Sequence, residues 1–324
     1  MKYRNLGRSG LSVSELCLGT MNFGPQADVP TSHQIMNTAI DNGINFFDTA
    51  DRYGGDTENL GWTEEIMGEW FSQDSTRREK VVLATKLYVQ MDPYPNNRGL
   101  SALHIRRACE ASLKRLKVDY IDLYQMHHID RDTPWDEIWQ AMDVLVQQGK
   151  ILYVGSSNFG GWHIAQAQER AKSRNFMGLI SEQSIYNLLT RDIEREVIPA
   201  ALDYGLGILP WSPLNGGILG GVIKKERDGK RRLNHGAAAQ VQELRPQLEE
   251  YENYCDELGH EPADVALAWL LAQPAVCSPI IGPRTVDQLM TSLPAIDVNL
   301  NSDQVARINA IFPGFKTAPE DYAW

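Results

Sequence analysis

The chain has 324 residues, 43% of them hydrophobic, which is enough to bury a full core. Its formal net charge of −11 argues against a nucleic-acid partner or an anionic membrane surface, because both attract basic proteins. No apolar run reaches the roughly 18 residues of a membrane span, and the N-terminus lacks a secretory signal, so we expect a cytoplasmic protein without a membrane partner.

In chain order, the first predicted element is a β-hairpin at 2–16, around a Gly-Arg-Ser-Gly turn, which is expected to close the floor of the fold. After it, a short apolar run followed by a helical stretch recurs along the chain. The predicted strands are 16–19, 45–48, 81–86, 120–127, 151–156, 179–183, 206–211 and 276–282. The predicted helices are 32–42, 59–71, 103–116, 134–148, 162–173, 193–204 and 262–272. Thr133 and Asp136 flank Pro134 with the spacing of a helix start.

Eight consecutive strands with helical stretches between them predict a closed (β/α)₈ barrel, an α/β fold that takes up residues 1–324 as one domain. The alternative is a doubly wound dinucleotide-binding fold, which needs GxGxxG after its first strand. The sequence LGTMNFG at 18–24 does not supply that motif, and GLGILP at 205–210 ends in a proline inside an apolar strand. A long irregular excursion is predicted at 215–240, after the seventh strand.

Three consecutive predicted strands end in ionisable side chains, which are Asp48, Lys86 and His127. Tyr53 follows five residues after Asp48, in the stretch NFFDTADRYGG. Strand ends of one barrel open on the same face, where catalytic residues lie, so we expect these four side chains to converge. Each alone has an ordinary structural explanation, such as a helix cap or a solvated strand end. At matching strand ends, the set favours catalysis.

This combination of side chains suits the reduction of a carbonyl group. A tyrosine has a pKa of about 10, and a neighbouring Lys86 ammonium is expected to lower it. Asp48 is expected to keep Lys86 charged, and His127 to donate a hydrogen bond to a carbonyl oxygen. Tyr53 can then protonate the alkoxide that forms when a carbonyl accepts hydride. We predict no metal, because His127 and His128 are adjacent on a strand and face opposite sides.

From residue 3 to about residue 315, the chain resembles the aldo-keto reductase superfamily. The matching motifs are DTADRYG (48–54), VVLATK (81–86), YIDLYQMH (120–127), GSSNF (155–159), EQSIYN (182–187), WSPL (211–214) and IIGPRT (280–285). The resemblance implies that the four residues above form a catalytic tetrad with Tyr53 as the general acid. It also implies NADP(H) lying extended across the barrel mouth, and the reduction of aldehydes or ketones to alcohols.

The residues expected to hold the cofactor lie at the later strand ends. Ser157, Asn158 and Gln183 offer amide and hydroxyl groups suited to a carboxamide, and Trp211 offers a flat apolar face to the nicotinamide ring. Arg284, at a predicted helix start, is expected to bind an adenosine 2′-phosphate and so to favour NADPH over NADH. The other expected contacts are Ser212, Pro213, Leu214, Gly216, Gly282, Gln288, Thr291 and Ser292. The last two stand where many members of the superfamily carry glutamate and asparagine, so contacts to the adenosine are expected to differ there.

The substrate is expected to be a small carbonyl compound that is apolar or aromatic rather than a charged sugar. This expectation rests on loop residues around the mouth that are aromatic or contain sulfur. They are Phe23, Tyr88, His128 and Phe159, with Met126, Trp135 and Trp324 nearby.

Alternatives stay open for several of these assignments. Arg284 could form a surface ion pair, and the glycines between 216 and 221 could make a flexible loop. The basic run at 224–232 is interpreted as a solvated loop that could close over a pyrophosphate. For the whole chain, one alternative is a cofactor-sensing subunit similar to potassium-channel accessory subunits. Another is a Schiff-base lyase that uses Lys86, which would give no reason for Asn158 and Trp211.

Overall fold

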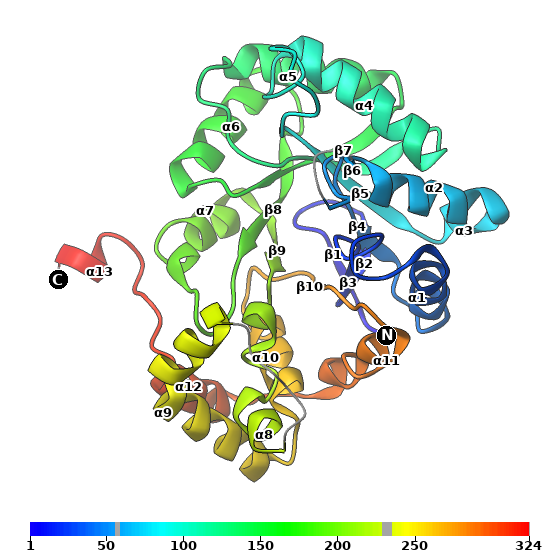
Figure 1. Cartoon of the computed structure of the whole chain (residues 1–324). Coiled ribbons are helices and arrows are strands. Elements are labelled where there is room, and N and C mark those ends of the chain that lie inside the picture. The colour runs from blue at the N-terminus through cyan, green and yellow to red at the C-terminus, as the bar shows by residue number, and fades with distance from the viewer. Residues whose placement is uncertain (56–58, 229–234, 324) are drawn as a thin grey trace.

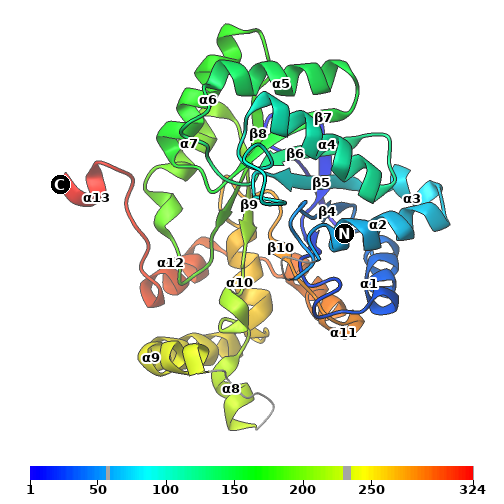
Figure 2. The ribbon, with the colours of Figure 1, turned by 45° about the horizontal axis from the view of Figure 1, so that its top comes forward.

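The computed structural model describes residues 1–55, 59–228 and 235–323 (Figure 1). Eight strands form one sheet in the order β10-β3-β4-β5-β6-β7-β8-β9, and every adjacent pair is parallel. Ile208 of β9 also bridges Val276, in the segment that leads into β10, so the two ends of the sheet meet. The predicted (β/α)₈ barrel is confirmed, with the sheet at the centre and helices outside it (Figures 1 and 2).

All eight predicted strands are present, most of them within one or two residues of the predicted limits. They are β3 (Cys17–Gly19), β4 (Phe46–Asp48), β5 (Val82–Leu87), β6 (Ile121–Met126), β7 (Ile151–Ser157), β8 (Leu179–Ile185), β9 (Gly207–Trp211) and β10 (Ile280–Ile281). Only the last differs much, because β10 has two residues and the pairing at Val276 is an isolated bridge.

The helices that cover the barrel are amphipathic. In α5 the buried side chains recur every three or four residues, as a helix packed on one face requires. The helices are α1 (Val29–Asp41), α2 (Trp62–Gln73), α3 (Thr76–Glu79), α4 (Ala102–Leu116), α5 (Trp135–Gln147), α6 (Gly161–Ser173), α7 (Val197–Tyr204), α8 (Val222–Arg227), α9 (His235–Leu258), α10 (Pro262–Leu271), α11 (Val286–Met290), α12 (Ser302–Ile311) and α13 (Glu320–Ala323). Short 3₁₀ turns lie at η1 (Asp192–Glu194), η2 (Asn215–Gly217) and η3 (Leu293–Asp297). In the described part of the chain, none of these helices has the length and apolar character to cross a membrane.

Several predicted helix limits were wrong. The helix predicted at 193–204 is divided into η1 and α7, and the excursion at 215–240 contains α8 and the start of α9. The basic run within that excursion continues beyond the described residues. The predicted cap of α5 is also wrong, because the N-cap is Pro134, and the Thr133 hydroxyl donates to Asp130 Oδ2 (2.9 Å) instead.

The N-terminal hairpin closes the floor of the barrel, as predicted. Strands β1 (Tyr3–Asn5) and β2 (Ser12–Ser14) pair antiparallel, and Leu6 and Val13 are fully buried among residues from inside the barrel. Gly7, at a φ of +55°, lies so close to β8 that a Cβ would approach the Ile180 carbonyl oxygen to 2.4 Å. The hairpin is therefore in direct contact with the amino ends of the strands.

The barrel interior changes from apolar to polar along each strand. Leu123 of β6 belongs to the small inner cluster that also contains Phe46 and Ala84, whereas Tyr124 and Met126 pack outward against the helices. Because strand side chains alternate, Gln125 follows Leu123 on the inner side, with His127 next. The apolar floor therefore gives way to polar side chains at the carboxyl end.

Candidate active site at the carboxyl end of the barrel

Lys86 is the centre of a buried polar cluster. Its side chain is fully buried, and its ammonium lies 2.6 Å from Asp48 Oδ2, a carboxylate that is itself 2% exposed. Lys86 Nζ also donates to the Thr49 carbonyl oxygen (2.8 Å) and to the Tyr53 hydroxyl (3.2 Å). All three N–H donors of the ammonium thus have an acceptor, which is what a buried charge requires.

The second oxygen of Asp48 is held by two amides. Asp48 Oδ1 accepts hydrogen bonds from Gln183 Nε2 (2.8 Å) and from Gln125 Nε2 (3.0 Å). Gln125 was not among the predicted site residues, because β6 also contains Asp122 and the sequence does not show which polar side chain of the strand faces the site. Gln183 was predicted to face a cofactor carboxamide. In the structure its side-chain nitrogen donates a hydrogen bond to Asp48, inside the barrel.

A tight turn after β4 places Tyr53. The Asp51 N–H donates to the Lys86 carbonyl oxygen (3.1 Å), and the Tyr53 carbonyl oxygen accepts from the N–H groups of Gly61 and Thr63. Gly54 has a φ of +152°, and a Cβ there would lie 1.8 Å from the Asn59 carbonyl oxygen. Only glycine allows the chain to return so closely beside Tyr53.

The pKa of Tyr53 differs in direction from the sequence expectation. Burial raises the pKa of Tyr53, Lys86 lowers it and Asp48 raises it, with the net result above the usual value of about 10. Burial would lower the pKa of Lys86, but Asp48 and Tyr53 raise it above its ordinary value. In the chain without ligand, Tyr53 is therefore a neutral phenol beside a charged ammonium.

His127 faces the same space as Tyr53. The two rings meet edge to face, with centroids 6.0 Å apart. Burial, followed by the charges of Lys86 and Arg52, lowers the pKa of His127 to about 3, so the imidazole is neutral at physiological pH. Its Nδ1 is buried and has no hydrogen-bond partner in the part of the chain that the structure describes.

His128 lies apart from His127, next to Tyr88, with ring centroids 5.3 Å apart. Within residues 1–55, 59–228 and 235–323, no group of three or more histidine, cysteine or acidic side chains could hold a metal ion.

Asn158 connects the strand ends around the mouth. Its backbone is left-handed, with a φ of 59°. Its side-chain nitrogen donates to the His127 carbonyl oxygen (3.2 Å) and to Ser157 Oγ (3.0 Å), and its Oδ1 accepts from Trp211 Nε1 (3.2 Å). The structure therefore brings Ser157, Asn158 and Trp211 together beside His127.

The loop after β9 carries further predicted cofactor residues. Ser212, Asn215 and Gly216 all have left-handed backbones, and Gly216 is exposed on the loop. The N–H groups of Asn215 and Gly217 donate to the carbonyl oxygens of Ser212 (3.0 Å) and Leu214 (2.9 Å), so hydrogen bonds within the loop hold its shape. Asn215 Nδ2 is buried and lacks a hydrogen-bond partner among the residues described. Pro213 is buried and Leu214 half-buried at the base of the loop.

Arg284 lies exposed beside α11. Its guanidinium donates to Gln26 Oε1 (3.1 Å), and no carboxylate in the described ranges lies within ion-pair distance of it. Arg284 therefore forms no surface ion pair with a carboxylate of the described ranges, which was the alternative interpretation of this residue. Thr285 caps α11, since its hydroxyl accepts from the Gln288 N–H (3.2 Å).

The remaining predicted adenosine contacts cluster around the same short helix. The hydroxyls of Thr291 and Ser292 both donate to the Gln288 carbonyl oxygen. Gly282 accepts a hydrogen bond from Asn22 Nδ2 (2.7 Å) through its carbonyl oxygen. Gly282 and Thr291 are exposed, and Ser292 is half-buried.

Two of the predicted substrate-pocket residues do not face open space. Phe23 is fully buried, and Phe159 is 3% exposed and packs against Trp135 in the layer between strands and helices. Both side chains fill the wall behind the mouth, and their contact with a substrate stays a prediction. Tyr88 and His128 lie at the rim, whereas Trp324 is outside the described residues.

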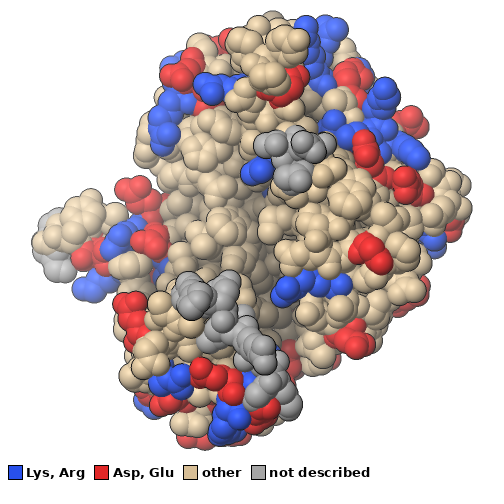
Figure 3. Space-filling view, in the orientation of Figure 1, with Lys and Arg blue, Asp and Glu red and all other residues tan. Residues whose placement is uncertain are grey.

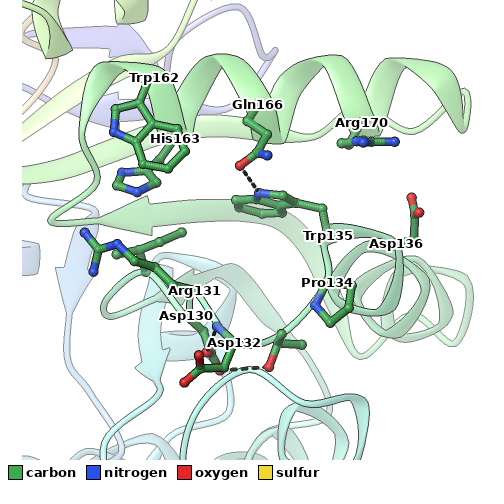
Figure 4. A pocket seen from close by; sticks show the side chains of 12 residues that line it. Asp130, Arg131, Asp132, Pro134, Trp135, Asp136, Trp162, His163, Gln166 and Arg170 are labelled. Carbon is green, nitrogen blue, oxygen red and sulfur yellow. Dashed lines mark hydrogen bonds between the residues drawn. The ribbon is translucent and has the colours of Figure 1, made fainter.

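A hollow lined mainly by uncharged residues crosses the face seen in Figure 3. A separate groove of about 430 Å³ lies between the 129–134 loop and α6. There Trp135 Nε1 donates to Gln166 Oε1, with Arg131 and Trp162 nearby (Figure 4). None of the four predicted catalytic side chains lines that groove, so it is distinct from the Lys86 cluster.

The burial of Lys86 also bears on the lyase alternative. A Schiff-base lysine must be a neutral, accessible amine. Lys86 is inaccessible, bonded to three oxygens and held charged by Asp48. The geometry therefore contradicts a lyase that uses this residue.

Residues 15–312 match the Aldo/keto reductase family. The chain is 54% identical over 329 residues to "Uncharacterized oxidoreductase YrpG" of Bacillus subtilis (strain 168), covering 100% of both proteins. It is 34% identical over 333 residues to "Probable voltage-gated potassium channel subunit beta" of Arabidopsis thaliana, covering 99% of this chain and 100% of that protein. It is 32% identical over 348 residues to "Versiconal hemiacetal acetate reductase" of Aspergillus parasiticus, covering 97% of this chain and 99% of that protein.

Proposed function

Because the chain belongs to the aldo/keto reductase family of oxidoreductases, we propose that it reduces aldehydes or ketones to alcohols with NADPH, and that Tyr53 is the acid. The observation that carries this proposal is the Lys86 ammonium, which bonds at once to Asp48 and to the Tyr53 hydroxyl. A neutral His127 faces the same space. Together these groups provide a proton donor, a charge beside it and a donor for a carbonyl oxygen.

The proposed reaction assigns one task to each side chain. When bound, NADPH supplies the hydride that the carbonyl carbon accepts. As the carbonyl oxygen gains charge, Tyr53 donates its proton to it, and the new C–H and O–H bonds complete the alcohol. The Lys86 ammonium, 3.2 Å away, stabilises the phenolate that remains. His127 orients the oxygen by a hydrogen bond, and Asp48 keeps Lys86 charged and in place.

The side chains around the mouth fit a nicotinamide dinucleotide. Asn158 presents an exposed amide beside the half-buried indole of Trp211, which suits a carboxamide on an apolar ring. Gly216 is exposed and has no side chain, so a pyrophosphate could approach the backbone of this loop closely. The exposed Arg284 guanidinium, without a carboxylate partner in the described chain, suits a 2′-phosphate. We propose that Gly282, Gln288, Thr291 and Ser292 border the adenosine.

The first experiment compares wild type with Tyr53→Phe in the consumption of NADPH with 4-nitrobenzaldehyde. We expect the variant to lose at least about 100-fold in kcat, because proton transfer by a positioned acid contributes about that much. Its Kd for NADPH should stay within about twofold, since the phenyl ring keeps the packing. Tyr204→Phe removes the hydroxyl from a tyrosine that bonds Glu169 on the outside of the barrel, and it should leave turnover unchanged. Equal turnover in wild type and Tyr53→Phe contradicts the assignment of the acid.

A second candidate is a cofactor-binding sensing subunit with little turnover. The observation that favours it is the similarity, over 99% of this chain, to a plant protein named as a probable potassium channel subunit beta. Tight NADPH binding by wild type together with negligible turnover over many aldehydes and ketones would support this candidate. Turnover that depends on Tyr53 would remove it.

A further inference from the structure

Glu182 is a buried carboxylate that the proposed chemistry does not use. It precedes Gln183 in β8, and its exposed fraction is 0%. Because side chains alternate along a strand, Gln183 faces Asp48 inside the barrel while Glu182 faces the opposite way. Glu182 therefore lies directly behind the mouth, in the layer between the sheet and the helices.

The carboxylate is satisfied by neutral donors alone in the part of the chain that the structure describes. Glu182 Oε1 accepts from the Phe159 N–H (3.0 Å) and from Ser184 Oγ (2.7 Å), and Oε2 accepts from Ser156 Oγ. No lysine or arginine in those ranges pairs with it. Burial raises the pKa of Glu182 to about 7. A buried acid without a counter-charge is costly, so an apolar residue would suit the core better if packing were its only task.

One of the hydrogen bonds to Glu182 comes from the turn that follows β7. The Asn158 N–H donates to the Gln183 carbonyl oxygen (3.0 Å), and the next N–H, that of Phe159, donates to Glu182. Two successive backbone donors are thus tied to two successive residues of β8. Between them Asn158 holds its left-handed backbone, which is sparsely populated for residues other than glycine. Any rotation of this turn would move the Asn158 amide away from Trp211.

We propose that Glu182 is a positioning residue that fixes the turn at 157–159, so that the Asn158 amide meets the nicotinamide end of the cofactor. This inference rests on the proposed function, because it assumes that NADPH binds at this mouth. Asn158 in turn ties the His127 carbonyl oxygen to the Trp211 indole. Glu182 thereby acts on the cofactor and on the end of β6 through Asn158, without touching either.

The test measures the Kd of NADPH and of NADH, by quenching of tryptophan fluorescence, for Glu182→Leu, Glu182→Asp and Glu182→Gln. Leucine removes the acceptor of the Phe159 N–H, and the shorter aspartate cannot reach that N–H. Each of these two variants should therefore raise the Kd of NADPH and the Kd of NADH at least about tenfold, a change of about 1.4 kcal/mol. Glutamine keeps an acceptor for Phe159 and can donate to Ser156 Oγ, so its Kd values should stay within about threefold of wild type. Equal weakening of both cofactors is expected because the nicotinamide end is common to them.

Asp122→Leu is the matched control for lost stability. Asp122 is also a buried carboxylate that accepts a backbone hydrogen bond, from the Leu83 N–H (2.8 Å), but it lies at the amino end of β6 and, unlike Glu182, pairs with an arginine, Arg78 (2.7 Å). This variant should lower Tm and leave both Kd values within about twofold. If Glu182→Leu does not fold, Glu182→Asp and Glu182→Gln carry the comparison. Cofactor affinity that is unchanged in folded Glu182→Asp overturns the positioning role, whereas absence of binding by wild type overturns the proposed function and this role with it.

Discussion

The Lys86 ammonium is shared by three oxygen atoms, and this sharing decides what Tyr53 can do. Asp48 takes the shortest of the three contacts, at 2.6 Å, and Tyr53 the longest, at 3.2 Å. Burial raises the pKa of Tyr53 more than Lys86 lowers it, so the phenol keeps its proton until an acceptor is present. In the proposed reaction, that acceptor is the charged carbonyl oxygen of the transition state.

The neutral state of His127 gives a prediction about pH. The pKa of His127 is about 3 in the folded chain and about 6.5 in an unfolded chain, so only the unfolded state takes up this proton between those values. We expect the free energy of unfolding of wild type, relative to His127→Gln, to fall as the pH drops from about 6.5 toward 3. Urea unfolding of both proteins at several pH values in that window measures the difference. A difference that does not change with pH would show that His127 is not held neutral by the fold.

Arg284 sets the expected choice between the two nicotinamide cofactors. Arg284→Gln should raise the Kd of NADPH by about tenfold or more, because a charge-assisted hydrogen bond contributes about 1.5–3 kcal/mol. The Kd of NADH should not change, since it has no 2′-phosphate. Arg307→Gln is a suitable control, because Arg307 is a surface residue that pairs with Glu250 on a different part of the molecule. Equal effects of Arg284→Gln on both cofactors would place the 2′-phosphate elsewhere.

Some residues of the candidate site could be predicted from the sequence, and others could not. Asp48, Lys86 and His127 could be predicted to converge, because each ends or directly follows a recognisable strand. Gln125 and Glu182 lie within strands, where a polar residue has meaning only once its burial and partners are known. The rise in the pKa of Tyr53 could not be predicted from the sequence either. It depends on how deeply the side chain is buried, and residue types alone do not show this.

At the scale of elements, the turn between β4 and α2 depends on Gly54. Gly54→Ala should lower kcat/KM at least about tenfold and destabilise the fold by more than about 1 kcal/mol, because its Cβ would collide with the Asn59 carbonyl oxygen at 1.8 Å and displace Tyr53. Gly55→Ala is the matched control. Its φ of +109° is also unfavourable for alanine, but the nearest atom to its Cβ among the described residues would be Pro25 Cγ, at 3.4 Å. Equal losses in the two variants would mean that backbone strain, and not the collision, accounts for the effect.

Strands were easier to predict than helices in this chain. Apolar, β-branched runs marked all eight barrel strands, because parallel strands covered on both faces need continuous apolar sequence. Helix limits depended on contacts that the sequence does not display, such as the Thr133 hydroxyl that turns to Asp130. Helix α9 was not predicted from residue 241 onward, since its sequence is mostly polar and contains Pro246.

At the scale of the whole molecule, closure of the barrel explains why residues far apart in sequence meet. Asp48 and Gln183 are 135 positions apart and share a hydrogen bond, because β4 and β8 lie across the same ring of strands. The closed ring followed from counting eight strand–helix units. The sequence predicted that the hairpin covers the floor of the barrel. It could not predict the contacts of the hairpin with the strands, which depend on the close approach of Gly7 to β8.

The sealed floor has a consequence for the supply of protons. Leu6 and Val13 of the hairpin region and Phe46 of β4 fill the barrel beneath Asp48 and Lys86 with apolar atoms. Such a layer conducts protons poorly. If Tyr53 is the acid, as proposed, we expect its new proton to come from the solvent at the mouth, on the same side from which the alcohol product would leave.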